Sequence, residues 1–393
     1  MNNTVDKFKA VRKLFPVTGK SRGITYLNCA STGPLCKPVK KVLDDYYEAN
    51  QYLDKNSDIA AFDDLAKIRK LGARMIGARA DEIGFGFHTG YGLNIAAFGL
   101  PLKRGDEVLL SDIEFPSNVY PWLALRERGI KVKFIKSVNK RFDIDNFRKA
   151  IGVKNRKRKK SKVLSLSFVQ FFNGYKNDLT TIGQICKDNG LYFVVDGIQG
   201  CGVETVNVHR SQVDIFSAGA QKWQLTPQGA GLFYVRKDIQ EKLITPFASW
   251  LSVDWNLNFT DLFHYDLPYF DSARRFEMGS YPYSHVHAMA AALDLIDSLG
   301  VKNIQRHNHQ LLDILIDYLK SSPYYRVVSD LKNKHRSSIL AFTCDDVKTV
   351  HKRLLGNKII CVQREGAIRI SVHLFNNEAD IKRLIAVLSE FDR

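Results

Sequence analysis

The stretch "SAGAQKW" (residues 217–223) carries a lysine between two short apolar segments. "VDIF" (213–216) before it and "GLFYV" (231–235) after it are typical of buried strands, and the intervening "QLTPQGA" has the proline and glycine of a turn. Lys222 is therefore expected beside a core strand, where an unpaired ammonium group is costly. Its position predicts that the amine takes part in chemistry.

Strand-like and helix-like segments alternate through the first two thirds of the chain. Such alternation is typical of βαβ units and a mostly parallel sheet. The segments are 107–112, 116–129, 131–136, 143–152, 162–169, 181–190, 191–197 and 213–219. Ligands of these sheets bind at the carboxyl ends of the strands. We therefore expect an α/β domain with helices on both faces and a site at that edge.

The last hundred residues have a different pattern. Two helical segments (285–300 and 303–322) are followed by short strands and helices, which predicts a small α+β domain. We expect three parts: an N-terminal segment, 1–50, that packs with the small domain, a large domain, 51–285, and a small C-terminal domain, 286–393.

Composition narrows the class of protein. The 393 residues are 45% hydrophobic, enough for two cores. No apolar run is long enough for a membrane span, and the N-terminus lacks the apolar stretch of a secretory signal. The six cysteines form no C-x-x-C pair, so neither a zinc site nor a disulfide scaffold is expected. These features predict a cytoplasmic protein with no metal site and no membrane partner.

The net charge is +17, and the run "KNRKRKKSK" (154–162) supplies seven of these charges. A solvated loop is the expected structure, and a contact with a polyanion is the alternative. No aromatic residue interleaves with the run, as a surface for single-stranded nucleic acid would require. Nucleic acid is therefore not an expected partner.

Three further segments belong with Lys222. Asp196 ends the strand-like "LYFVVD" and is either a turn residue or the partner of a protonated ring nitrogen. An aspartate for a pyridinium and a lysine for an aldehyde are the groups that pyridoxal 5′-phosphate (PLP) requires. "HTGYGLNIAAFGL" (88–100) opens a helix whose N-terminus suits phosphate. Phe115, just after a strand, is either a core residue or a ring that stacks on a cofactor.

In this order and spacing, the segments resemble the aminotransferase class V family of fold-type I PLP-dependent enzymes. That family includes cysteine desulfurases, selenocysteine lyases and isopenicillin N epimerase. The resemblance extends from "YLNCASTGPL" (26–35) to "IRISVHLFNNEADIKRL" (368–384) and is strongest in "EFPSNVYPW", "VDGIQG", "QKW", "RRFEMGS" and "IRISVHLFNN". It implies a large PLP-binding domain, a small C-terminal domain, PLP as cofactor and a homodimer with a shared site.

The resemblance implies roles for four residues around the ring. Lys222 matches the lysine that forms the Schiff base with PLP, and Asp196 the aspartate paired with the pyridine nitrogen. Gln199 matches a glutamine near the phenolic oxygen. Phe115 takes the place of the stacking ring, where desulfurases carry histidine.

Five more residues match binding positions of the family. Thr89 and Gly90 match the phosphate-binding turn, and Gln221, beside the lysine, can donate through its amide. Ser280 matches a threonine that reaches the phosphate of the neighbouring subunit. Arg369 matches the arginine that binds the substrate's α-carboxylate.

The sequence departs from the family pattern at two phosphate positions. The family has Thr-Thr or Thr-Ser in the turn, where this chain has Gly90 second. It has Ser-x-His-Lys before the Schiff base, where this chain has Gly219, Ala220 and Gln221. Two hydroxyl donors are therefore missing. A degenerate, non-catalytic member with a basic polyanion-binding surface is one alternative.

The resemblance implies an enzyme that acts on an amino acid through an external aldimine, as an aminotransferase or a C–S or β-lyase. Cysteine desulfurase or selenocysteine lyase chemistry is the other alternative. Desulfurases use a cysteine on a mobile loop before the arginine; Cys361 lies eight residues before Arg369, but in a strand-like run that favours a buried structural role. Gln170 and Asn173 are both candidates for the residue that contacts the cofactor oxygen. His264, Tyr265, Tyr269, Tyr281 and Tyr283 are candidates for the substrate pocket or for interface packing.

Overall fold

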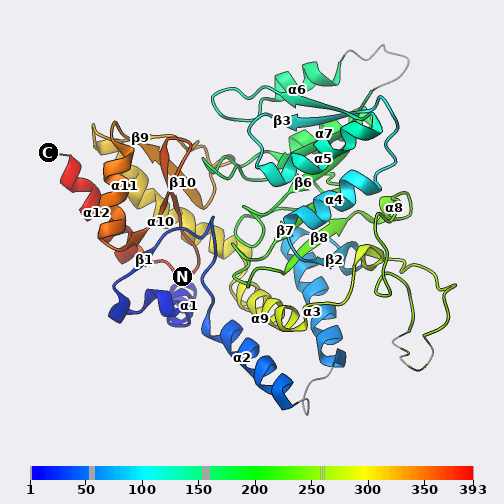
Figure 1. Cartoon of the computed structure of the whole chain (residues 1–393). Helices are drawn as coiled ribbons and strands as arrows, with labels where there is room; N and C mark the ends of the chain where they lie inside the picture. Colours follow the sequence, from blue (N-terminus) through cyan, green and yellow to red (C-terminus); the bar gives the residue numbers. More distant parts are fainter. Residues whose placement is uncertain are drawn as a thin grey trace.

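The computed structural model describes residues 2–52, 58–152, 160–256, 258, 260 and 262–392. These residues form a large lobe around one sheet and a smaller lobe around another (Figure 1). The chain enters beside the small lobe, builds the large lobe and returns to finish the small one.

The large lobe contains a seven-stranded sheet with the order β2-β8-β7-β6-β5-β3-β4. Its strands are β2 (Ile83–Gly86), β3 (Glu107–Ser111), β4 (Lys131–Ile135), β5 (Ser161–Ser167), β6 (Tyr192–Asp196), β7 (Ile215–Gly219) and β8 (Gly231–Val235). Within the described sheet β8 pairs antiparallel with both of its neighbours, and the other pairs are parallel. The prediction of a mostly parallel α/β sheet is confirmed.

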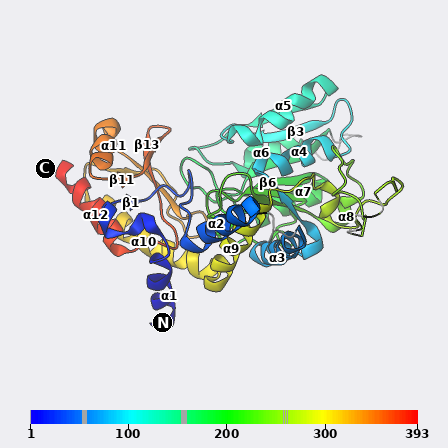
Figure 2. The same cartoon turned by 60° about the horizontal axis from the view of Figure 1, so that its bottom comes forward.

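Helices cover both faces of this sheet. Val108 and Leu110 of β3 pack in the core under α4 (Thr89–Gly99) and α5 (Tyr120–Ala124), whereas Leu109 packs in the opposite core. This alternation follows from the two-residue period of a strand that is buried on both sides. The opposite face carries α3 (Asp58–Ile76), α6 (Ile144–Ile151), α7 (Leu179–Asn189) and α9 (Tyr283–Leu299). α9 packs on both α3 and α2 (Lys37–Tyr52) (Figure 2).

The small lobe has its own core and an antiparallel sheet of order β12-β13-β10-β9. Its elements are α10 (Val301–Ser321), β9 (Arg326–Val327), β10 (Ile339–Thr343), α11 (Val347–Gly356), β11 (Ile359–Ile360), β12 (Val362–Arg364), β13 (Ala367–Ser371) and α12 (Glu378–Leu388). The remaining short elements are α8 (Lys237–Gln240) and the 3₁₀ turns Pro16–Thr18, Lys20–Arg22, Ala80–Glu82, Pro116–Asn118, Leu125–Arg128, Ala273–Phe276 and Ser389–Phe391. The helix expected over 116–129 is thus broken into two 3₁₀ turns around α5.

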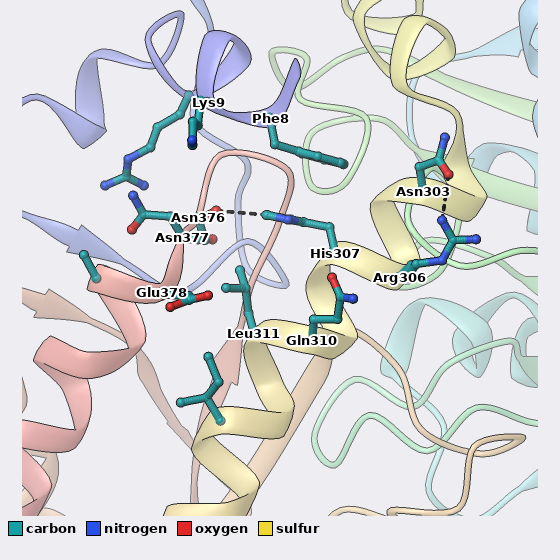
Figure 3. Close-up of a pocket in the computed structure, with 13 residues that line it drawn as sticks. Phe8, Lys9, Asn303, Arg306, His307, Gln310, Leu311, Asn376, Asn377 and Glu378 are labelled. Atoms are coloured by element: carbon teal, nitrogen blue, oxygen red, sulfur yellow. Dashed lines mark hydrogen bonds between the residues drawn. The ribbon is translucent and has the colours of Figure 1, made fainter. Parts of the chain in front are cut away.

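The N-terminal segment lies against the small lobe. Its β1 (Thr25–Tyr26) pairs in parallel with β11. In α1 (Asn2–Arg12), the Phe8 ring stacks on His307 of α10 at 4.1 Å between centroids (Figure 3). Arg12 binds Asp380 at 2.7 Å. A cavity of about 380 Å³ lies between α1, α10 and the start of α12.

A buried carboxylate joins the two lobes. Glu204, 1% exposed, accepts hydrogen bonds from Lys176 Nζ at 3.0 Å and from the backbone N–H of Ser338 at 2.8 Å. Burial by itself raises the pKa of Glu204, but His309 and Lys176 lower it on balance. The lobes are therefore connected by paired polar groups as well as by the chain.

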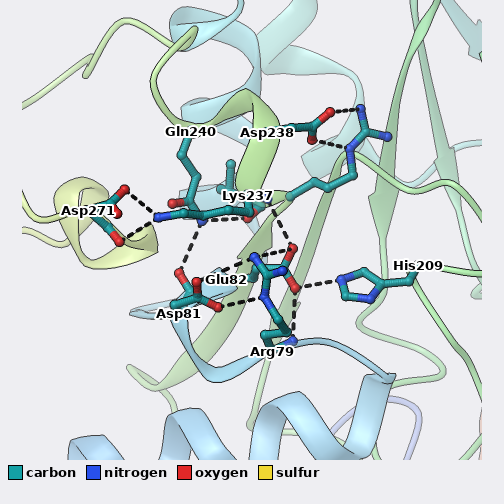
Figure 4. Close-up of polar contacts among 10 residues, drawn as sticks. Arg79, Asp81, Glu82, His209, Lys237, Asp238, Gln240 and Asp271 are labelled. Atoms are coloured by element: carbon teal, nitrogen blue, oxygen red, sulfur yellow. Dashed lines mark hydrogen bonds and ion pairs between the residues drawn. The ribbon is translucent and has the colours of Figure 1, made fainter.

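A second buried carboxylate fixes the edge of the large sheet that lies opposite the carboxyl ends of its parallel strands. Glu82 binds the His209 ring at 2.6 Å and accepts from the backbone N–H of Lys237 at 3.1 Å (Figure 4). It thus links the start of β2 to the end of β8, and its role is structural. Among the described residues, no helix combines the length and the apolar character needed to cross a bilayer.

Candidate active site

Predicted site residues gather at the carboxyl edge of the large sheet. A cavity of about 630 Å³ opens there, between the ends of β6 and β7, the start of α4 and the β12–β13 hairpin. The predicted residues that line it are Thr89, Gly90, Phe115, Gln199, Gln221, Lys222 and Arg369. Asp196 lies behind this lining at the end of β6 and interacts electrostatically with Lys222.

Lys222 follows the end of β7 by three residues, and its backbone is held by the N-terminal segment. Gly33 N–H donates to the Gln221 carbonyl at 2.8 Å, and a Cβ on Gly33 would come within 2.1 Å of the Lys222 carbonyl oxygen. Burial lowers the pKa of the Lys222 amine to about 8, against the opposing effect of Asp196. A neutral, nucleophilic amine is therefore accessible near physiological pH.

Asp196 is 3% exposed. Burial raises its pKa to about 7, the neighbouring Glu114 carboxylate adds to this rise, and the Ile198 N–H and Lys222 oppose it. The Ile198 N–H donates to Asp196 Oδ1 at 3.0 Å. Because few groups neutralise this carboxylate, a cationic N–H directed at it would be strongly stabilised.

Glu114 is a site neighbour that sequence reasoning missed. It is 9% exposed and accepts hydrogen bonds from Ser167 Oγ at 2.5 Å and Asn118 Nδ2 at 2.9 Å, while burial raises its pKa. Its position next to Phe115, just after a strand, was the available signal. Gln170, one of the two open candidates for the cofactor oxygen, donates to Glu114 at 3.1 Å.

The flat side of the cavity is aromatic. The Phe115 ring is 39% exposed and packs edge-on against Phe171 at 5.2 Å between centroids. The Lys222 Nζ lies 5.7 Å from the Phe115 centroid. Phe171 lines the cavity, whereas Asn173 binds the Lys140 carbonyl at 2.9 Å and serves the loop structure. An exposed ring beside the lysine suits a planar ligand.

Gln199 is fixed by its two neighbours. Its amide nitrogen donates to the Ala30 carbonyl at 3.0 Å, and its oxygen accepts from Trp223 Nε1 at 2.9 Å. The His373 ring in turn contacts the Trp223 carbonyl at 2.8 Å. The second N–H of the Gln199 amide is left for a ligand, in a fixed orientation.

At the other end of the cavity, the first turn of α4 meets Gly219 and Gln221. Thr89 Oγ1 accepts from the Gly219 N–H at 2.9 Å, which orients its hydroxyl. A Cβ on Gly219 would lie 2.5 Å from Gln221 Oε1, so the glycine makes room for the glutamine side chain. Gln221 Oε1 is buried and has no hydrogen-bond partner among the described residues.

His88, the N-cap residue of α4, also lines the cavity and was not singled out from the sequence. A Cβ on Gly90 would lie 3.2 Å from His88 Nδ1. The two glycines at the departures from the family pattern thus each leave space for a longer polar side chain. Together with the helix N-terminus, these groups fit a phosphate.

Arg369, in β13, is 2% exposed and has no acidic partner among the described residues. Its guanidinium donates to the Phe171 carbonyl at 2.5 Å and to Ser31 Oγ at 2.8 Å, and its Nε has no partner there. Burial lowers its pKa to about 10, and the nearby Arg364 adds to this effect. A carboxylate in the cavity would supply the missing charge.

Other predicted residues lie elsewhere. Ser280 is exposed and does not line the cavity. None of the candidates from the 264–283 region lines it either; Tyr281 is buried and donates to Glu277, and Tyr265 is 83% exposed. Most of the basic run, 154–159, lies outside the described residues.

Cys361 does not reach the cavity. It is 5% exposed and belongs to the core of the small lobe, and burial raises its pKa to about 12. A buried, protonated thiol is a poor nucleophile.

The fold and the site define a class: α/β enzymes that hold an aldehyde cofactor on a lysine. The available groups fit PLP, because an amine, an under-neutralised carboxylate, an exposed ring and an anion site surround one cavity.

A model of the aminotransferase class-V family matches residues 25–384, so the chain belongs to that family. The predictions of the family, the fold-type I architecture, a PLP-dependent enzyme and PLP as cofactor are confirmed.

Similar proteins have names from two reaction types. An uncharacterized aminotransferase of Schizosaccharomyces pombe is 26% identical over 97% of this chain and 95% of its own length. A probable cysteine desulfurase of Methanothermobacter thermautotrophicus is 28% identical, with 94% and 95% covered. The solved complex of the cystine C–S lyase C-DES with cysteine persulfide has a TM-score of 0.83 at 22% identity, covering 94% of this chain and 98% of that chain. This last similarity establishes the shared fold.

Proposed function

We propose that this PLP-dependent enzyme acts on an amino acid as an aminotransferase or as a C–S or β-lyase, with Lys222 as its catalytic residue. The observation that carries the proposal is the pairing of a lysine whose pKa is about 8 with a buried carboxylate at the same edge of the sheet. PLP, when bound, supplies an electron sink for the electron pair left when a bond at the substrate's α-carbon breaks.

Lys222 would hold the cofactor through its nucleophilic amine, and the same amine would accept or donate a proton at the substrate's α-carbon. Asp196 would bind the ring nitrogen and keep a proton on it. Phe115 would cover the ring and exclude water from one side. Gln199 donates its free N–H to the phenolic oxygen, and Trp223 holds it in place.

Thr89, Gly90 and Gln221 bind the phosphate in this proposal. Support comes from the N-terminus of α4 and the oriented Thr89 hydroxyl, and Gln221 would donate through its amide nitrogen. Ser280 adds a contact from a second copy of the chain, which makes the enzyme a homodimer. Exposed apolar side chains in the segment that precedes Ser280 support such an interface: Leu262, Phe263, Tyr265, Tyr269 and Met278.

Arg369 binds the α-carboxylate of the amino acid. Its lack of an acidic partner and its burial both support this role. By fixing the carboxylate, Arg369 determines which bond at the α-carbon stands perpendicular to the cofactor ring, and therefore which bond breaks.

Sulfur release from cysteine or cystine is the second candidate, because similar proteins carry those names. A persulfide relay through Cys361 has no support, because its thiol is buried in the small-lobe core. A lyase that needs no cysteine relay fits better.

We also propose the division into a large domain, 51–285, and a small domain, 286–393, with residues 1–50 packed against the latter. The separate core of the small lobe and the β1–β11 pairing support this division, whereas α2 and α9 pack together in the core of the large lobe. A cytoplasmic location is proposed because the six cysteines are free.

The test is the visible absorption spectrum of the purified protein while single amino acids are added. The expected result is a band of lysine-bound cofactor that is absent in Lys222→Ala and that an amino acid substrate displaces. Absence of the band in the parent protein after PLP is added, or turnover retained by Lys222→Ala, would refute the proposal. Lys242→Ala, which lies outside the cavity, is the control variant.

A further inference from the structure

The turn that closes the cavity is a tight hairpin. β12 and β13 pair antiparallel, with Arg364 opposite Ala367 and Val362 opposite Arg369. The two residues between the strands, Glu365 and Gly366, have φ values of 47° and 78°. Two positive φ values are typical of a type I′ turn, the tightest connection between two strands. The hairpin therefore has little freedom to move.

Pairing places both arginines on one face of this hairpin. Directly opposed residues share a face, and so do residues two apart on a strand. Arg364, Val362 and Arg369 thus share a face, and both arginines line the cavity. Cys361 and Ile368 fall on the other face, in the small-lobe core.

The hairpin tip is anchored on both sides. Lys140 Nζ of the large lobe lies 3.4 Å from the Glu365 carbonyl oxygen, and Thr343 Oγ1 donates to the Gly366 carbonyl at 2.9 Å. Arg364 is consequently carried by a fixed backbone at the mouth of the cavity.

The cavity has more positive charge than the proposed reaction uses. Lys222, Arg364 and Arg369 line it, and no Asp or Glu does so among the described residues. In the proposed reaction the Lys222 amine holds the cofactor, and Arg369 binds the α-carboxylate of the substrate. The side chain of Arg364 has no ion pair or hydrogen bond with a described residue, and its charge contributes to lowering the pKa of both Lys222 and Arg369. Because the phosphate is assigned to Thr89, Gly90 and Gln221, Arg364 is the one lysine or arginine of the described lining without a partner in the proposed reaction.

We propose that Arg364 is a specificity-determining residue that binds a second acidic group on the substrate side chain. The preferred substrates are then α-amino acids with two acidic groups. This inference rests on the function proposed above, and it adds the substrate class that the reaction type leaves open. A guanidinium suits the task because it binds carboxylates through two parallel hydrogen bonds.

The experiment compares amino acids that carry a second acidic group with matched amino compounds that lack this group. The pairs are aspartate and asparagine, glutamate and glutamine, and cystine and the mixed disulfide of cysteine with cysteamine. They sample three side-chain lengths. The dissociation constant of each comes from the change that it causes in the cofactor absorption band.

In the parent protein we expect at least one pair in which the acid binds about 10-fold or more tightly than its neutral partner, because a charge-assisted pair is lost in the latter. Arg364→Ala should bring that ratio close to one, and Arg364→Lys should keep part of it. Arg364→Glu should invert it. Arg326→Ala, an exposed arginine of the same lobe outside the cavity, should keep the parent ratio.

Three results would overturn the inference. In the first, amino acids change the absorption band, but those with a second acidic group bind no more tightly than their neutral analogues; this result leaves the proposed function intact. In the second, Arg364→Ala weakens PLP binding and keeps the ratio, which would place Arg364 at the phosphate. In the third, no amino acid changes the band, which would refute the proposed function as well.

Discussion

Adding one methyl group at Gly219 should weaken PLP binding indirectly, by displacing the side chain of Gln221. In Gly219→Ala the new Cβ would lie 2.5 Å from Gln221 Oε1, about 0.9 Å short of ordinary contact at 3.4 Å. If the Gln221 amide moves by that amount, a hydrogen bond of normal length to the phosphate becomes longer than 3.5 Å and is lost. A hydrogen bond to a charged group contributes about 1.5–3 kcal/mol, so the dissociation constant should rise about 10- to 100-fold.

The assay is a titration of cofactor-free protein with PLP, followed by absorption. A double-mutant cycle isolates the cause, because Gly219→Ala should have less than about a twofold effect when Gln221 is already alanine. Gly356→Ala is the control, since a Cβ there meets no atom within 4 Å. The reasoning is refuted if Gly219→Ala binds PLP as tightly as the parent, or if its effect is the same in both backgrounds.

Two further predictions follow from the buried amine and the buried thiol. The pKa of Lys222 is about 8, below its ordinary value, so the neutral amine becomes more abundant as the pH rises. The rate of covalent PLP attachment should therefore increase roughly fivefold from pH 7 to pH 8 and level off above pH 9. A stopped-flow rate that is flat over this range would contradict the prediction. Cys361→Ala should change turnover of L-cysteine by less than about twofold, as should the matched buried variant Cys344→Ala, because neither thiol reaches the cavity. Selective loss of sulfur release in Cys361→Ala, with an unchanged melting temperature, would restore the persulfide relay.

The positions of most strands of the large sheet and the residues that line the cavity could be predicted because their signals are local. The apolar runs that became β3, β5, β6 and β7 are buried on both faces and therefore read as continuous hydrophobic segments. The antiparallel direction of β8 depends on the turn geometry after Lys222, which periodicity does not encode. The broken helix over 116–129 has a different cause, because Pro121 removes a backbone donor that a continuous helix from Pro116 would use.

Residues that act across the fold were harder to find. Glu114 changes the pKa of Asp196 from 82 positions away, and only the sheet brings the two together. His88 and Arg364 stand beside predicted residues, but their exposure to the cavity depends on the missing Cβ of Gly90 and on the pairing of β12 with β13. From the sequence, Gly90 and Gly219 indicate only that two hydroxyl donors to the phosphate are missing. The structure shows that Gly90 leaves space for His88 and that Gly219 leaves space for Gln221.

The β12–β13 hairpin also limits how this chain could diverge. With only Glu365 and Gly366 between paired strands, any substitution in the segment still leaves each side chain on the face that its register dictates. A thiol introduced at 363 would point away from the cavity, like Cys361, and one at 364 would be carried by a backbone too short to swing toward a partner protein. Acquiring a mobile sulfur carrier at this place would therefore require inserted residues and not point mutations alone.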